Sequence, residues 1–234
     1  LTAMQKDLSS YKGKTSTSSP SPHEWENAFG DADVVFCITI TSTLSGTYNS
    51  AVIAKDIYEQ NHAGRKVYVL DSLSTGPEIA LFIEKIAELI KAGFTPDDIY
   101  KTLLEYKDKT HLYFSLASLN NFAKNGRISP VIAAGIGLLG VRVVGKASDE
   151  GTLLPLDKCR GEKRALKKLI DHLKECGYTD GKIIIAHNNN EAGALELKKL
   201  IENTFGIFNG KIQKTRALCS YYAEPGSLLI GFEA

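Results

Sequence analysis

The stretch from residue 34 to residue 51 constrains the fold of this chain more than any other part of the sequence. An apolar, β-branched run from Val34 to Ile40 leads into a turn dense in hydroxyl side chains, and the turn opens into a helical pattern. A strand that feeds a helix in this way places the turn at a helix N-terminus, where free backbone N–H groups and the helix dipole favour an anion. The residues placed there are Ser45, Gly46 and Thr47. They predict a bound phosphate or carboxylate, while an ordinary helix cap is the alternative interpretation.

Strand and helix patterns alternate through the first half of the chain. The expected strands are 33–41 and 66–71, and the expected helices are 23–29, 46–61, 77–92 and one that begins at Thr95 and Pro96. Residues 1–22 are polar and are expected to form a loop. This alternation is typical of a parallel sheet covered by helices on both faces, so it predicts a three-layer α/β/α domain.

The second half combines short strands with long helices. Strands are expected at 111–117, 140–147, 182–187, 211–217 and 227–232, and helices at 118–124, 129–139, 162–176 and 191–205. The pattern predicts an α+β domain with a mixed sheet. We therefore expect an N-terminal domain at 1–109 and a C-terminal domain at 110–234.

Composition excludes several classes of protein. The formal net charge of +1 provides no long-range field for nucleic acid. The longest uncharged apolar stretch, 128–141, is too short to span a bilayer, and no signal-peptide pattern opens the chain. Cys37 lies in an apolar strand and is expected to be a buried, reduced thiol. These features predict a cytoplasmic protein without a metal or cofactor.

Motifs of common enzyme sites are incomplete or absent. Gly13, Lys14 and Thr15 suggest a phosphate loop, but the required earlier glycine position is Leu8. No G-x-S-x-G segment is present, and the histidines show no metal-ligand spacing. His187 ends an apolar strand, where a surface position is favoured over a catalytic role. Arg127 follows a glycine turn and is either an anion partner or an ordinary surface charge.

Several segments together resemble the DegV family of bacterial fatty-acid-binding proteins. Residues 17–21 are similar to the family's T-S-x-P-S segment, and residues 38–48 to its I-S-S-x-L-S-G-T-Y segment. The strand-end Asp-Ser at 71–72, Asn-Gly-Arg-Ile-Ser at 125–129, Arg-Gly at 160–161, His187 and Pro-Gly at 225–226 follow in family order.

The resemblance implies a two-domain, non-enzymatic carrier that holds one long-chain fatty acid, with its tail in an apolar tunnel. It implies that hydroxyls hold the carboxylate, and the ligand-binding set becomes Thr17, Ser18, Ser45, Gly46, Thr47, Ser72, Arg127 and His187. In some members the acid is presented to a fatty-acid kinase, and transient membrane contact is a further implied interaction. The alternative is a phosphotransfer or acyl-transfer enzyme component that acts on a small phosphorylated metabolite, with His187 as its acid–base candidate.

The sequence departs from the family pattern at two places. Family members begin with a strand and a D-S-T segment well before the T-S-x-P segment, so a truncated N-terminus is expected here. The family's H-T-G-P-G segment is Tyr-Ala-Glu-Pro-Gly at 222–226, with Tyr222 in place of the histidine and Glu224 in place of a glycine. A carboxylate beside an anionic head group repels it unless it points away. Kinase coupling and the head-group chemistry depend on how these two residues lie.

Overall fold

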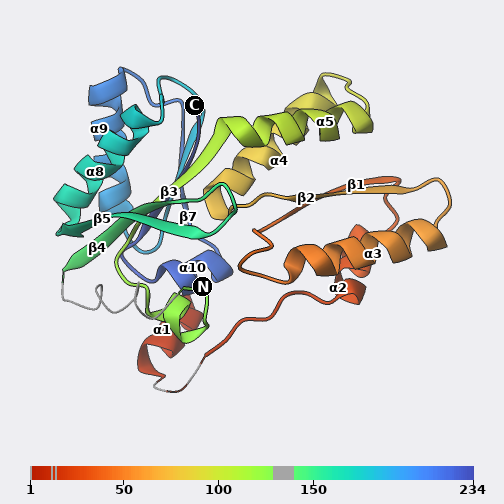
Figure 1. Cartoon of the computed structure of the whole chain (residues 1–234), viewed down its shortest axis with the longest axis horizontal. Helices are drawn as coiled ribbons and strands as arrows, with labels where there is room; N and C mark the ends of the chain where they lie inside the picture. The colour runs from red at the N-terminus through yellow and green to blue at the C-terminus, as the bar shows by residue number, and fades with distance from the viewer. Residues whose placement is uncertain (1, 12, 14, 129–139) are drawn as a thin grey trace.

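The computed structural model describes residues 2–11, 13, 15–128 and 140–234, which form two β-sheets with helices around them (Figure 1). The strands are β1 (Val34–Thr39), β2 (Lys66–Asp71), β3 (Thr110–Leu116), β4 (Val141–Ala147), β5 (Leu153–Arg160), β6 (Ile183–His187), β7 (Gly210–Lys214) and β8 (Leu228–Glu233). The helices are α1 (Thr2–Ser10), α2 (Pro22–Phe29), α3 (Thr47–Asn61), α4 (Gly76–Lys91), α5 (Pro96–Tyr106), the short 3-10 helix η1 (Lys107–Lys109), α6 (Asn120–Lys124), α8 (Glu162–Glu175), α9 (Glu191–Phe205) and α10 (Ala217–Ala223).

The first sheet is a parallel pair, β1 and β2, with Val34 opposite Lys66. Successive residues of β1 point to opposite faces, as in any strand. Phe36 and Ile38 pack against the core formed by α4 and α5, whereas Cys37 packs against α2 and α3. Figure 1 shows the two helix pairs on opposite sides of these strands. This arrangement confirms the predicted three-layer α/β/α architecture.

The second sheet has six strands in the order β5-β4-β3-β8-β6-β7. Its neighbouring strands are antiparallel except for β6 and β7, which are parallel, so the predicted mixed sheet is confirmed. Helices α8 and α9 cover one face through a large apolar core that includes Leu166, Leu169, Leu197 and Phe232. The other face is directed toward α4 and toward the cavity described below.

Helix α4 packs against both sheets. Its first turn lies directly on β8, where a Cβ added to Gly231 would be 2.5 Å from the backbone nitrogen of Glu78. Ile184 of β6 belongs to the same apolar core as the residues of α4 and α5. The hydroxyl of Thr110, the first residue of β3, donates to the Glu78 carboxylate at 2.7 Å. The domain boundary near residue 109 stays a prediction.

Short-range sequence signals set the starts of α2 and α5, and the predicted helix start at Thr95 and Pro96 is confirmed. Ser21 and Glu24 form a reciprocal capping box at the start of α2, with Pro22 in the first helical position. The Thr95 hydroxyl accepts the backbone N–H of Asp98 and begins α5. These signals act within four residues, so they do not depend on the rest of the fold.

Three parts of the structure differ from the sequence prediction. Thr2–Ser10 forms a helix within the segment expected to be a loop. Strand β5 was missed because it contains Pro155, which cannot donate to a sheet ladder but is tolerated here since β5 is an edge strand. The strand expected at 211–217 ends at Lys214, and α10 follows it. The helix expected at 129–139 lies outside the described residues.

Candidate functional site

The turn that precedes α3 carries a pair of hydrogen-bonded hydroxyls. The Oγ of Ser45 lies 2.7 Å from the Oγ1 of Thr47, and it also accepts the Thr47 backbone N–H at 3.3 Å. Gly46 is the N-cap of α3 with an ordinary φ of −71°, so its conformation does not require glycine. One N–H of the helix start is therefore occupied by a side chain of the turn, and the hydroxyl pair is the feature that this turn presents to a ligand.

A second hydroxyl pair comes from the segment between α1 and α2. Residues 15–20, which we call the strap, have no regular secondary structure. The Oγ1 of Thr17 lies 2.9 Å from the phenol oxygen of Tyr222 on α10. At the far end of the strap, the Ser50 hydroxyl of α3 donates to the Pro20 carbonyl at 2.6 Å. The strap thus connects α10 to α3 and carries Thr17 between them.

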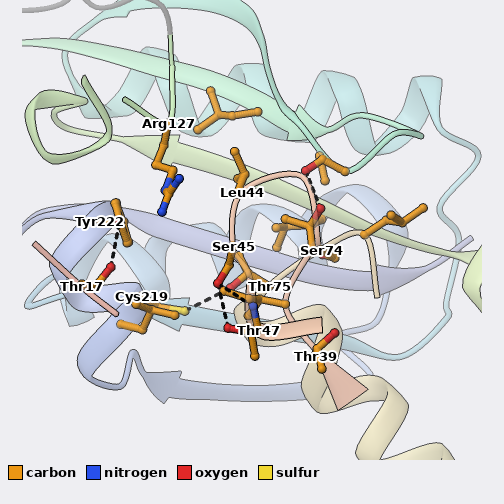
Figure 2. A pocket seen from close by; sticks show the side chains of 18 of the residues that line it. Thr17, Thr39, Leu44, Ser45, Thr47, Ser74, Thr75, Arg127, Cys219 and Tyr222 are labelled. Atoms are coloured by element: carbon orange, nitrogen blue, oxygen red, sulfur yellow. Dashed lines mark hydrogen bonds between the residues drawn. The ribbon is translucent and has the colours of Figure 1, made fainter. Parts of the chain in front are cut away.

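Both hydroxyl pairs line one cavity of about 620 Å³ that lies between the two sheets. Figure 2 shows Ser45, Thr47 and the Thr17–Tyr222 pair around it, with Arg127 directed toward it. Its apolar wall comes from β3, β8, the β4–β5 hairpin and the residues around them, including Leu112, Phe114, Leu116, Ala147, Leu153 and Leu229. The cavity therefore joins a hydroxyl-rich region to a largely apolar one.

The two pairs supply hydrogen-bond donors without supplying charge. A Ser, Thr or Tyr hydroxyl carries one hydrogen and can also accept. Within each pair one hydrogen lies between the two oxygens, so the other hydrogen is free to point into the cavity. Two pairs thus offer two outward donors, one for each oxygen of a carboxylate.

The structure brings together six of the eight residues in the predicted ligand-binding set. Those that line the cavity are Thr17, Ser18, Ser45, Gly46, Thr47 and Arg127. Ser72 and His187 are not among its lining residues. Ser72 is buried, and its hydroxyl accepts the backbone N–H of Ser74 within the same turn.

His187 is buried rather than at the surface, which corrects the favoured interpretation of this strand-end residue. It is 4% exposed, and its Nδ1 accepts the backbone N–H of Asn190 at 3.3 Å. Burial lowers the pKa of the imidazole, so the neutral form is favoured. A strand end is buried here because β7 and β8 flank β6 on both sides.

Glu224 points away from the hydroxyl pairs. It is absent from the cavity lining, and its Oε1 accepts the hydroxyl of Ser118 at 2.9 Å and the backbone N–H of Asn121 at 3.1 Å. The carboxylate therefore accepts a backbone N–H at the N-terminus of α6, where a negative charge is stabilising. The backbone of Glu224 has a φ of +57°, in the positive range that favours glycine. The repulsion expected from an acid beside an anionic ligand is avoided by this orientation.

Several cavity residues had no signal in the sequence analysis. Cys219 and Thr75 meet at the start of α4, where Cys219 Sγ lies 3.6 Å from Thr75 Oγ1 (Figure 2), and Ser74 lines the cavity one residue earlier. The apolar wall residues alternate along β3, which is the one sequence pattern that assigns them to a single face. Sequence alternation does not say which face is the cavity.

A buried carboxyl group lies next to the cavity wall. Glu78 is 4% exposed and accepts hydroxyl hydrogens from Ser74 and Thr110. Burial is the main influence and raises the pKa of this carboxyl above its ordinary value. No metal cluster accompanies it: within the described ranges, no group of three or more His, Cys, Asp or Glu side chains is arranged to hold a metal ion.

This carboxyl predicts a specific pH dependence of stability. Because the folded-state pKa of Glu78 is raised, its favourable contribution is complete below the ordinary carboxyl pKa and is lost as pH rises through the raised value. In the wild-type protein the free energy of unfolding is therefore expected to fall as pH rises above the ordinary carboxyl pKa. We expect this fall to be smaller in Glu78→Gln, whose side chain does not titrate. Urea unfolding of both proteins between about pH 4 and about pH 8 measures this. Parallel curves for the two proteins would contradict it.

Burial also raises the pKa of the Cys37 thiol, which lies in strand β1 as predicted. Cys37 lies in the core between β1 and α3, and this raises its pKa to about 12. The thiol therefore stays protonated at neutral pH, as expected of a buried, reduced cysteine.

Among the described helices, none combines the length and apolarity that crossing a bilayer would require.

Comparisons with known proteins agree with this architecture. A DegV domain-containing protein of Streptococcus pneumoniae is 44% identical over 214 residues, which cover 92% of this chain and 76% of that protein. The crystal structure of a DegV family protein from Eubacterium eligens, loaded with heptadecanoic acid, matches with a TM-score of 0.97 and 41% identity, covering 100% of this chain and 84% of that one.

A second solved structure matches equally well. It is the Streptococcus pneumoniae Fatty Acid Kinase (Fak) B3 protein loaded with linoleic acid, with a TM-score of 0.97 and 41% identity over 99% of this chain and 83% of that one. The family model described as "Uncharacterised protein, DegV family" matches residues 3–234. With nearly its whole length matched by that model, the chain belongs to the DegV family.

Proposed function

We propose that this chain binds one long-chain fatty acid in the cavity between its two sheets. The observation that carries the proposal is a single cavity with an apolar wall and two hydroxyl pairs, Ser45–Thr47 and Thr17–Tyr222. Each buried methylene of an acyl chain contributes about 0.8 kcal/mol, and the desolvated carboxylate requires donors. The two similar structures loaded with heptadecanoic acid and linoleic acid support the same ligand class.

The chain-length dependence of binding tests the apolar part of the cavity. Since a methylene contributes about 0.8 kcal/mol, affinity is expected to rise roughly fourfold per added carbon from dodecanoic acid upward, as long as the added carbon is buried. Isothermal titration calorimetry with saturated acids of increasing length measures this slope. An affinity independent of chain length would mean that the tail lies in solvent.

We further propose that the chain is a carrier that performs no chemistry itself, with a fatty-acid kinase as partner. The similarity to a protein named for a fatty-acid kinase supports this partner. His187, the acid–base candidate for an enzymatic role, does not line the cavity. Incubation with ATP and a bound fatty acid is expected to give no acyl phosphate unless a fatty-acid kinase is added. Turnover by the purified chain alone would favour the phosphotransfer alternative.

Ligand exchange provides a reason for transient membrane contact. Leu218 of α10 lines the cavity and is 36% exposed, so an apolar side chain at the cavity reaches solvent. We propose that this part of α10 meets a lipid surface when the acid is loaded or released. Leu218→Ser is expected to slow fatty-acid transfer from vesicles while leaving equilibrium affinity within about threefold. Vesicle transfer followed by stopped-flow fluorescence measures the rate.

A further inference from the structure

Two adjacent tyrosines on α10 have different surroundings. Tyr222 lines the cavity, whereas Tyr221 is 5% exposed and is not among the cavity residues. The phenol oxygen of Tyr221 lies 2.7 Å from the Oγ1 of Thr15 and accepts a hydrogen bond from the Nδ2 of Asn125 at 2.9 Å. Tyr221 therefore joins two segments that are far apart in the sequence.

The direction of the hydrogen bond between Asn125 and Tyr221 follows from the other partner of the Asn125 amide. The Nδ2 of Asn125 also donates to the carbonyl of Asn121 at 2.9 Å, and a carbonyl only accepts, which fixes the orientation of the amide. The amide hydrogen is thus donated to the Tyr221 oxygen, and in the contact between Tyr221 and Thr15 either hydroxyl can be the donor. The result is a hydrogen-bonded chain that runs from Asn125 through Tyr221 to Thr15.

Each end of this chain lies two residues before a cavity residue. Thr15 precedes Thr17 in the strap, and Asn125 precedes Arg127 in the turn that follows α6. In the described part of the chain, hydrogen bonds from other segments reach the strap only at Thr15, Thr17 and Pro20. The Tyr221 hydroxyl is thus the fixed point on the N-terminal side of Thr17.

We propose that Tyr221 is a positioning residue for the head-group site. It holds Thr17 against Tyr222 and fixes the turn that carries Arg127, without touching the ligand itself. The inference rests on the proposed function, since it assigns to Tyr221 the seating of groups proposed to bind a carboxylate. In this proposal Tyr222 contacts the ligand directly, and Tyr221 acts by holding Thr17, the hydrogen-bond partner of Tyr222, in place.

The first test replaces Tyr221 with phenylalanine, which removes one oxygen and keeps the ring. Heptadecanoic acid and heptadecanol, which share a tail but differ in head group, are titrated into each protein. Tyr221→Phe is expected to weaken binding of the acid about fivefold, the effect of one hydrogen bond, and to leave the alcohol within twofold. A merely structural loss would weaken both ligands alike, and that result would overturn the proposal.

A matched control comes from a tyrosine outside the site. Tyr178 is also buried, and its hydroxyl donates to the Gly181 carbonyl at 3.0 Å, away from the cavity residues. Tyr178→Phe therefore removes a comparable hydrogen bond and is expected to leave the acid-to-alcohol preference unchanged. An equal change of preference in both variants would count against a specific role for Tyr221.

The partner of Tyr221 provides a second variant. Thr15→Val is expected to reproduce the effect of Tyr221→Phe, Thr15→Ser to preserve wild-type binding, and the Thr15→Val, Tyr221→Phe double variant to add little to either single change. Full additivity in this cycle would mean that the two side chains act independently and would contradict the proposal.

Hydrogen exchange separates this inference from the proposed function. In the ligand-free protein, Tyr221→Phe is expected to raise amide exchange in the turn 125–127, whose backbone N–H groups donate to carbonyls of α6, and Tyr178→Phe to leave it unchanged. If the wild-type protein bound neither ligand while Tyr221→Phe still raised exchange in this turn, fatty-acid binding would be refuted and the role of Tyr221 in seating the turn would be retained. Unchanged exchange in Tyr221→Phe would refute the positioning role whatever the ligand.

Discussion

Ser45→Ala is expected to weaken the binding of heptadecanoic acid by about ten- to hundredfold. A hydrogen bond to a charged group contributes about 1.5–3 kcal/mol, and about 1.4 kcal/mol corresponds to tenfold in affinity. The substitution removes the Ser45 hydroxyl and leaves Thr47 without its hydroxyl partner at 2.7 Å, so the remaining donor is no longer held in place. Isothermal titration calorimetry of the two proteins, after removal of lipid carried over from expression, measures the difference.

Ser42 provides the matched control for this substitution. It belongs to the same turn but does not line the cavity, and its described contact is a backbone N–H that donates to the Asp71 carboxylate. Ser42→Ala therefore removes a hydroxyl from the turn and keeps that backbone contact. Affinity is expected to stay within twofold of wild type. Equal losses for the two alanine variants, or no loss for Ser45→Ala, would contradict the head-group assignment.

Gly231→Ala is expected to destabilise the folded protein strongly. A Cβ at this position would lie 2.5 Å from the Glu78 nitrogen and 2.6 Å from the Pro77 carbonyl carbon, both backbone atoms of α4 that cannot move away alone. Inserting a methyl group into such a contact costs about 1–3 kcal/mol or more. We expect the urea midpoint of unfolding to fall accordingly, and fatty-acid binding to weaken as well because Ser74 and Thr75 precede this helix in the cavity wall.

A second glycine distinguishes overpacking from the general cost of a glycine substitution. At Gly46, the nearest atom to an added Cβ is the Ser19 hydroxyl at 3.6 Å, and φ is −71°. Gly46→Ala is therefore expected to change the free energy of unfolding by less than about 1 kcal/mol, the scale of an N-cap effect. If Gly231→Ala were as stable as Gly46→Ala, α4 would not be seated on β8 as described.

The sequence predicted the elements whose determinants are local. The apolar run of β1, the hydroxyl turn and the helical pattern of α3 lie next to each other in the chain, so their arrangement follows without long-range information. Strand β5 and helix α10 depend on distant contacts instead. Pro155 is compatible with a strand only at a sheet edge. The short α10 is held from distant segments, since the Nδ2 of Asn188 donates to the Ser220 carbonyl at 2.8 Å and the Nδ2 of Asn121 donates to the Tyr221 carbonyl at 2.7 Å.

The same distinction applies to the site. Ser45 and Thr47 were predicted from a strand–turn–helix pattern and Thr17 from the resemblance of its segment to a family motif, and all three line the cavity. Ser72 also follows a strand, but its hydroxyl turns back onto its own loop. The role of Tyr221 requires knowledge that Thr15, more than two hundred residues earlier, lies beside it. No sequence pattern joins such distant side chains.

We propose that the fatty-acid carboxylate lies between the hydroxyl pairs Ser45–Thr47 and Thr17–Tyr222, with its tail along the apolar wall. A crystal structure of the protein with heptadecanoic acid tests it most directly. We predict elongated electron density that ends in a carboxylate within hydrogen-bond distance of Ser45 and Thr17 and continues past Phe114. A cavity without such density under saturating acid, or an acyl chain with its carboxylate at the opposite end, would contradict the claim.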